Sequence, residues 1–161
     1  MKVLVTSSTK EGIEMKKTET EYDLLGVWLD FAFNSLVGEL NRSLHSVGLP
    51  LNHAQFVILQ NLFLKDGQSQ NDIARRVGKD RAAISRSLNT LEENGFILRK
   101  AVSGSKNGIF LTEKAIENRN KITEAINMAI RKGRGEMTDE EYKNGMSFLR
   151  RLYENLHANE K

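Results

Sequence analysis

The chain has no cysteine and a single proline among its 161 residues. Without cysteine it can form no disulfide framework, no thiolate zinc site and no cysteine nucleophile or redox switch. It also lacks any run of about 18 apolar residues, so no segment is expected to span a membrane. The N-terminus carries a short apolar patch but not the longer apolar stretch of a secretory signal. These absences are compatible with a reducing cytosol, and we expect a cytoplasmic protein.

Positive charge is concentrated in one part of the chain. The formal net charge is +3 and the sequence pI is about 9.2. Between residues 65 and 106, nine lysines and arginines stand against five acidic residues, whereas the rest of the chain has a net charge of −1. A local basic excess is the footprint of a surface that contacts phosphate groups, although a solvated charged face has the same composition.

The apolar pattern predicts one mainly helical domain, residues 21–161, with a small β-hairpin. The first twenty residues show no period and are predicted to be a tail or arm. Met15 followed by two lysines resembles a natural start, which would make residues 1–14 an extension. Capping signals at Asn52, Ser69 and Asp80 predict three helices in the middle of the chain. Two β-prone runs, 96–100 and 108–111, flank a turn-rich segment and predict the hairpin.

Longer helices are predicted on both sides of this central part. Residues 22–47 are apolar on more than one helical face, which a partner subunit could cover. Thr112 is predicted to cap one long helix that ends near Gly133–Gly135. Thr138 starts the last helix, whose apolar residues follow the 4-3-4-3 spacing of a coiled-coil seam: Tyr142, Met146, Leu149, Tyr153 and Leu156.

The order helix, short helix, tight turn, helix, hairpin predicts a winged helix-turn-helix over residues 51–112. In that arrangement the second helix of the pair enters a major groove. In the segment Asp80–Glu93, about 100° per residue places three apolar residues on one side. The opposite side carries Ala82, Arg86, Asn89 and Glu93, with Ser85 beside them. Arginine suits guanine edges or phosphates, and asparagine suits adenine edges.

This arrangement predicts a set of DNA contacts. One helix N-terminus would bind phosphate through the side chains and amides of Ser69, Gln70 and Asn71, and backbone phosphates would be neutralised by Lys79 and Arg81. The bases would be approached by Ala82, Ser85, Arg86 and Asn89. The hairpin would lie on the DNA backbone through Arg99, Lys100 and Lys106. The alternative is an amphipathic surface helix and a solvated hairpin of an ordinary domain.

Residues 51–112 resemble the core of the MarR family of transcriptional regulators. The matching pieces are LNHAQFVILQNLF, SQNDIARRVGKDRAAISRSLNTLEENGFILRK and IFLTEKA. Two features depart from the family pattern: the wing tip, residues 103–107, has no arginine, so Lys106 is its substitute, and Ala115 stands where a glycine is usual.

The resemblance implies a symmetric homodimer formed by helices in residues 22–47 and 113–158. Such a dimer would bind a pseudo-palindromic double-stranded operator whose half-sites lie about one helical turn apart. Repression is the default expectation, because a dimer on a promoter tends to block polymerase. The resemblance also implies release by a small, often aromatic or phenolic, effector. Its candidate lining residues are Trp28, Phe31, His45, His53 and Phe56, of which the two phenylalanines and the tryptophan are alternatively core residues.

Two other classes of protein compete with this interpretation. An enzyme would need a mechanism, and the sequence offers neither a glycine-rich phosphate loop nor a nucleophile with its base. A metal-sensing variant would need carboxylates beside the three histidines; we expect neither metal nor cofactor. A winged-helix module that binds protein in place of DNA is favoured by the arginine-free wing tip and opposed by the local basic excess.

Overall fold

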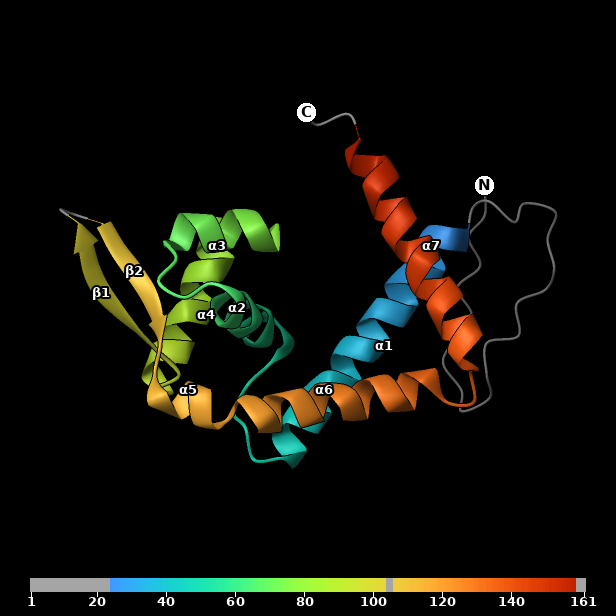
Figure 1. The fold of residues 1–161 in the computed structure, drawn as a ribbon, viewed down its shortest axis with the longest axis horizontal. Helices are drawn as coiled ribbons and strands as arrows, with labels where there is room; N and C mark the ends of the chain where they lie inside the picture. The colour runs from blue at the N-terminus through green and yellow to red at the C-terminus, as the bar shows by residue number, and fades with distance from the viewer. Residues whose placement is uncertain (1–23, 104–105, 159–161) are drawn as a thin grey trace, which may run out of the picture. The chain divides into compact units, whose positions relative to one another are not determined.

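The computed structural model describes residues 24–103 and 106–158. It shows a mainly helical chain with one two-stranded antiparallel sheet, as the sequence predicted (Figure 1). The elements in chain order are α1 (Leu25–Ser46), α2 (His53–Leu64), α3 (Gln70–Val77), α4 (Arg81–Glu93), β1 (Ile97–Ser103), β2 (Lys106–Leu111), α5 (Glu113–Glu117), α6 (Arg119–Arg134) and α7 (Asp139–His157).

The chain divides into two compact units, Met1–Phe33 and Asn34–Lys161. Of the first unit the structure describes residues 24–33, which form the N-terminal part of α1. In this part Trp28 and Phe31 meet edge to face, with ring centroids 6.1 Å apart. The predicted tail, residues 1–20, lies outside the described residues.

Side-chain caps fix the starts of α2, α3, α4, α5 and α7. The Asn52 side chain accepts a hydrogen bond from the Gln55 amide at 3.0 Å, and the Gln55 side chain accepts one from the Asn52 amide at 2.9 Å. Thr138 and Glu141 form the same reciprocal arrangement at the start of α7. Each capping box satisfies two amides that the helix itself leaves unpaired. The sequence predicted both.

The prediction of one long helix after Thr112 is wrong at Asn118. Thr112 caps the short α5, and the chain leaves the helix at Asn118 before α6 begins. The Asn118 side chain donates to the Lys114 carbonyl at 2.8 Å, so it competes for a backbone acceptor at the point where the helix divides. The helix α6 then continues through Gly133 to Arg134, and Gly135 follows it with a φ of 52°.

The hydrophobic core lies mainly in the segment from α2 to β2. Leu59, Leu62 and Ile73 are fully buried and belong to one cluster with the inward face of α4, with Phe96 just before β1 and with Ile109 in β2. Fully burying one such side chain stabilises a fold by about 1.5–3 kcal/mol. Burial of its apolar side therefore fixes α4 in the core, while the opposite side of the helix remains exposed to solvent.

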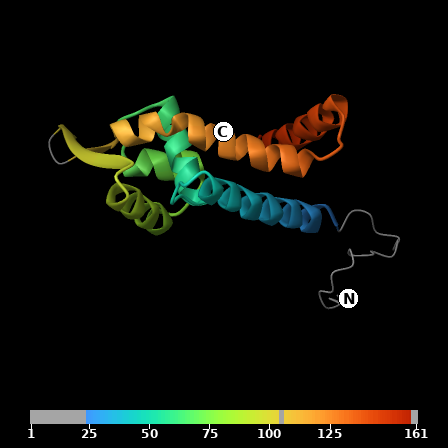
Figure 2. The ribbon, with the colours of Figure 1, turned by 90° about the horizontal axis from the view of Figure 1, so that it is seen from below.

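The hairpin is longer than the sequence predicted and is anchored to the loop after α2. Its register pairs Ile97 with Leu111. The two strands lie side by side in Figure 1, and Figure 2 shows the hairpin turned by 90°. The Gly67 amide donates to the Ile109 carbonyl at 3.0 Å, and the Ile109 amide donates to the Gln68 carbonyl at 2.9 Å. Gly67 has a φ of +72°, and a Cβ there would lie 2.8 Å from the Phe110 ring, so this anchor requires glycine.

The flanking helices leave large apolar side chains uncovered. In α7 no described residue is buried, and Tyr153 and Leu156 are 64% and 71% exposed. In the first unit Trp28 is 50% and Phe31 43% exposed, so neither belongs to the core of the single chain. Within the described residues, every helix is too short or too polar to cross a membrane.

Candidate nucleic-acid interface

The turn between α3 and α4 is fixed at both ends. Gly78 ends α3 with a φ of 66°, and the following Lys79 amide donates to the Ala74 carbonyl at 3.2 Å. Asp80 caps α4 by accepting from the Ala83 amide at 2.8 Å. This hydrogen bond is the largest cause of an Asp80 pKa below the ordinary value. Capping at both sides of so short a connection sets the direction in which α4 leaves the turn.

The predicted faces of α4 are confirmed by burial. Ile84, Leu88 and Leu91 are 2%, 0% and 0% exposed. On the other side Ala82, Arg86, Asn89 and Glu93 are exposed, and Ser85 is half-buried. The outward side of the helix thus presents a small residue, a guanidinium and an amide, which are groups that can approach base edges in a major groove.

Arg99, at the base of the wing, is bound to α4. Its guanidinium forms an ion pair with Glu92 and donates a second hydrogen bond to Asn89 Oδ1 at 2.8 Å. Its own amide donates to Glu92 Oε1 at 3.1 Å. Three bonds therefore join the first strand of the wing to the C-terminal half of α4. From the sequence, Arg99 is predicted to lie on the DNA backbone, and no local pattern indicates these bonds.

The start of α3 is engaged in its own cap. The Ser69 hydroxyl accepts from the Asp72 amide at 3.2 Å and donates to Asp72 Oδ2 at 2.6 Å. This hydroxyl, followed by the Arg75 guanidinium, lowers the Asp72 pKa. Asn71 is exposed, and the Gln70 side chain donates to the Arg81 carbonyl at 3.4 Å across the turn. Of the three predicted phosphate contacts here, Asn71 has the most exposed side chain.

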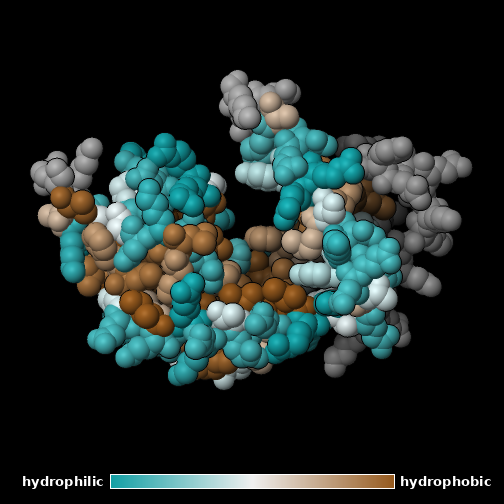
Figure 3. Space-filling view, in the orientation of Figure 1, coloured by the Kyte–Doolittle hydropathy of each residue, from teal (hydrophilic) through white to brown (hydrophobic). Residues whose placement is uncertain are grey.

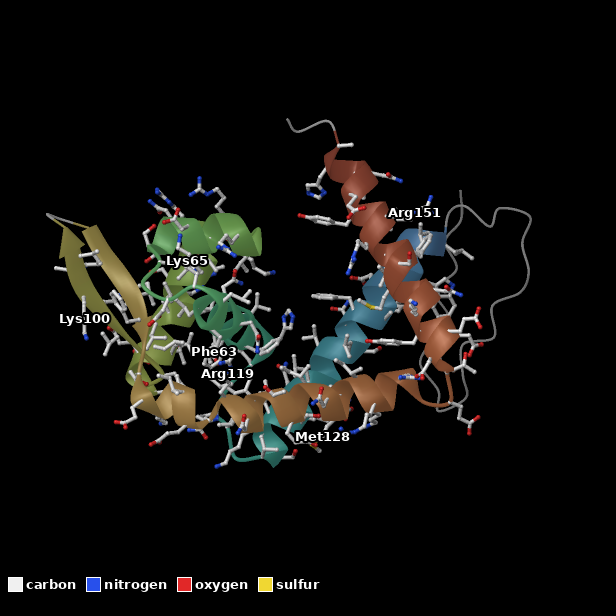
Figure 4. The ribbon with its side chains drawn as sticks, in the orientation of Figure 1. Phe63, Lys65, Lys100, Arg119, Met128 and Arg151 are labelled. Carbon is white, nitrogen blue, oxygen red and sulfur yellow. The ribbon has the colours of Figure 1, made fainter. Side chains whose placement is uncertain are left out.

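The remaining predicted cations lie on the surface of the winged helix-turn-helix, residues 51–112, which we call the lobe. Lys79 and Arg81 are exposed at the turn, and Lys100 is exposed on β1 with its Nζ 5.8 Å from the centre of the Phe110 ring (Figure 4). Lys106 begins β2, but its side chain and the tip residues 104–105 lie outside the described part of the chain.

The helix α3 adds two exposed arginines that are not among the predicted contacts, Arg75 and Arg76. Arg75 pairs with Asp72, one turn earlier on the same helix. The surface over α3 is hydrophilic (Figure 3). The signal in the sequence was the Arg-Arg pair itself, which lies inside the basic stretch.

The predicted effector residues are divided between the two compact units. Trp28 and Phe31 belong to the first unit, and His45, His53 and Phe56 to the second. Phe56 packs half-buried against the core, with its ring centroid 6.5 Å from that of His53. Burial, and secondly the charge of Lys79, lowers the His53 pKa below the ordinary value. His45 is exposed near the end of α1.

A hollow of about 430 Å³ lies along α7. Among the described residues it is lined by Asn144, Ser147, Phe148, Arg151, Leu152 and Asn155. Arg151 is labelled on this helix in Figure 4. None of the five predicted effector residues lines this hollow. In the described part of the chain, no three histidine or acidic side chains gather closely enough to hold a metal ion.

Comparison with known proteins places this geometry in a class. Residues 51–106 match the model of the MarR family. An organohalide-sensing regulator in its 2,4-dichlorophenol-bound form is 24% identical with a TM-score of 0.75, over 94% of this chain and 93% of that one. A MarR-family protein of Mycobacterium tuberculosis in complex with DNA is 22% identical with a TM-score of 0.66, over 80% and 96%. At these identities the likeness shows the fold.

A curated relative also matches a part of the chain. The antitoxin HicB of Escherichia coli K12 is 37% identical over 76 residues, which are 44% of this chain and 55% of the antitoxin. The chain thus spans about half of that relative's length.

The lobe is a winged helix-turn-helix. This class includes DNA-binding transcriptional regulators that have a recognition helix and a wing. Within that class, the matched segment and the fold are similar to those of the MarR family of transcriptional regulators, in agreement with the sequence resemblance.

Proposed function

We propose that the chain is a homodimeric repressor that binds a pseudo-palindromic double-stranded operator and leaves it when a small aromatic ligand binds. The observation that carries the DNA-binding part is the outward side of α4, where Arg86 and Asn89 are exposed on a helix fixed by the Asp80 cap and by a buried apolar side. The solved structure of a similar protein with DNA supports the same use of the fold.

The dimer is supported by the uncovered apolar side chains. Met146, Leu149 and Tyr153, which share the predicted seam of α7, are 49%, 43% and 64% exposed in the single chain. Each exposed aliphatic side chain costs free energy that burial against a partner would recover, about 25 cal/mol per Å². A symmetric dimer would cover such a face on both copies and would place two recognition helices on one duplex.

The first experiment measures DNA binding by fluorescence anisotropy. The purified full chain is titrated against its own upstream intergenic DNA and against a scrambled duplex at several salt concentrations. We expect tight, sequence-preferring binding whose logarithm falls steeply with the logarithm of salt concentration, because phosphate contacts release counterions. Failure to bind either duplex at low salt would overturn the proposal and favour the protein-interaction module.

The effector is tested with one defined probe. Trp28 is the only tryptophan of the chain, so fluorescence excited at the long-wavelength edge, where the three tyrosines absorb little, reports on that residue. Because a structure similar to this chain holds 2,4-dichlorophenol, we expect this phenol to change the Trp28 emission and to release labelled operator at the same concentrations. Labelled DNA without protein controls for direct quenching of the label by the phenol, and a Trp28→Phe variant tests whether the emission change comes from Trp28. Release without an emission change would remove Trp28 from the proposed site.

A further inference from the structure

The ion pair and hydrogen bonds of Arg99 indicate a different role for this residue from that of the other cations of the wing. Its side chain is 24% exposed, and its positive charge lies against the carboxylate of Glu92. A guanidinium has five N–H donors in a planar fork, so it can hold Glu92 and a second acceptor in one fixed geometry. The second acceptor is Asn89 Oδ1, at 2.8 Å.

The bond to Asn89 fixes the orientation of an exposed amide on the recognition helix. An amide side chain presents an acceptor on one side and two donors on the other. Since Arg99 donates to the oxygen, the oxygen side of the amide is turned to the wing and the nitrogen is left as the group available to a ligand. Among the described residues, no protein acceptor binds Asn89 Nδ2.

This orientation changes which base the amide can read. Recognition of adenine by asparagine uses the amide oxygen to accept from N6 and the nitrogen to donate to N7. Here the oxygen already accepts from Arg99, so a base edge that offers acceptors alone is a better match. In the major groove guanine is such a base, because it presents N7 and O6. The adenine contact predicted for this asparagine from residue type alone therefore gives way to guanine.

We propose that Arg99 is a positioning residue that holds the amide of Asn89 in a donor orientation and thereby gives the operator half-site a guanine preference at one position. The proposal rests on the proposed DNA-binding function and deepens it. It predicts that Arg99 acts on sequence preference and contributes little to the salt dependence, because its charge is compensated by Glu92 and its donors are engaged.

The experiment selects duplexes from a random library with the purified full chain and with variants, and then measures the affinity of the selected sites against salt. An Asn89→Ala variant identifies the position that Asn89 reads, as the position where the base preference disappears. The double variant Glu92→Gln with Arg99→Met removes the ion pair without changing its net charge. We expect this variant to lose most of the guanine preference at that same position, about fivefold to tenfold, with the salt slope unchanged.

Lys100→Met is the matched control, since it removes the neighbouring exposed cation. A backbone contact by Lys100 would lower the salt slope by about 0.9 while base preferences stay as they are. Combining the charge-balanced double variant with Asn89→Ala completes a cycle. A purely structural role of Arg99 would add its effect to that of Asn89→Ala, whereas positioning makes the two effects overlap. If the double variant does not fold, Arg99→Lys replaces it, because lysine keeps the charge and loses the planar fork.

Three results would overturn the proposal in different ways. If the wild type selects a defined site and the Arg99 variants keep its base preference but lower the salt slope, Arg99 is a backbone contact and only this inference fails. If the wild type selects no sequence at all, the proposed function fails together with it. Adenine at the position identified by Asn89→Ala would also contradict the donor orientation.

Discussion

The helices α4 and α7 carry apolar residues at similar helical spacing, yet the apolar face is buried in α4 and exposed in α7. In α4, Leu88 and Leu91 are completely buried by the lobe, whereas in α7, Met146 and Leu149 are 49% and 43% exposed. Helical periodicity therefore predicts that a face will be covered, but not by what. Where the chain itself supplies the cover, the helix belongs to a closed core. Where it does not, the face is available to a second molecule.

The exposed sides of the two helices differ as well. The outward side of α4 is polar, with Arg86 and Asn89, and matches the groups of a major groove. That of α7 is apolar along its seam, which matches another apolar surface. The proposed function gives the two faces independent roles, in which the face of α4 would bind DNA and that of α7 would bind a second copy. Changes confined to one face should leave the other function intact.

The largest effect is expected from breaking the apolar face of α7 with Leu149→Asp. A symmetric dimer would lose two leucines at about 1.5–3 kcal/mol each, which corresponds to a dissociation constant about 10²–10⁴-fold higher. Sedimentation equilibrium over a concentration series measures this change. Operator affinity should fall with dimerisation, because one subunit reaches a single half-site.

Ser147→Asp serves as the control for Leu149→Asp. It adds the same charge to α7 at a position that is not part of the predicted seam, and we expect it to leave the dimer largely intact. If both variants sediment like the wild type, the α7 seam is not the dimer interface.

The second-largest effect is expected on stability, from a substitution in the buried apolar side of α4. Leu88→Ala should lower the free energy of unfolding by about 2–5 kcal/mol, because it removes a fully buried side chain and leaves a cavity. Urea unfolding at a fixed protein concentration measures it. Glu93→Ala, on the exposed side of the same helix, should change stability by less than about 0.5 kcal/mol. Equal effects of the two substitutions would mean that the α4 face is not closed as described.

The two regions also differ in how far the sequence alone could predict them. The caps at Asn52, Ser69 and Asp80 were predictable because each capping signal lies within four residues. The faces of α4 followed from their spacing. The division at Asn118 was not predictable from spacing, since the apolar period continues across it. The bond between Arg99 and Asn89 joins two elements whose contact depends on how the hairpin packs, and no local pattern encodes it.

The third-largest effect is expected on DNA affinity, from a substitution on the polar face of α4. Arg86→Ala should lower affinity for the selected operator by about 1–3 kcal/mol if the guanidinium binds a guanine edge, and should relax the preference at that base pair. Lys106→Ala, on the wing, should instead weaken all duplexes alike and lower the salt slope by about one. Anisotropy titrations of both variants against matched and mismatched duplexes separate the two patterns. Wild-type binding by both variants would show that the contacts are assigned to the wrong residues.

The smallest effect is expected from the Asp80 cap as the pH falls. Its carboxylate accepts backbone hydrogen bonds in the folded lobe, chiefly from Ala83, so the folded pKa lies below the ordinary value. The unfolded chain therefore binds a proton more readily, and the stability that the cap contributes is present above the ordinary aspartate pKa of about 4 and is lost as the pH falls through the folded pKa. Asp80→Asn keeps a capping acceptor but cannot titrate. We expect its unfolding free energy to fall less steeply with pH below about 4 than that of the wild type. Urea unfolding of both proteins between pH 7 and pH 3 tests this expectation. Parallel curves would mean that other carboxylates account for the acid sensitivity of the lobe, such as Asp72, whose pKa is also lowered.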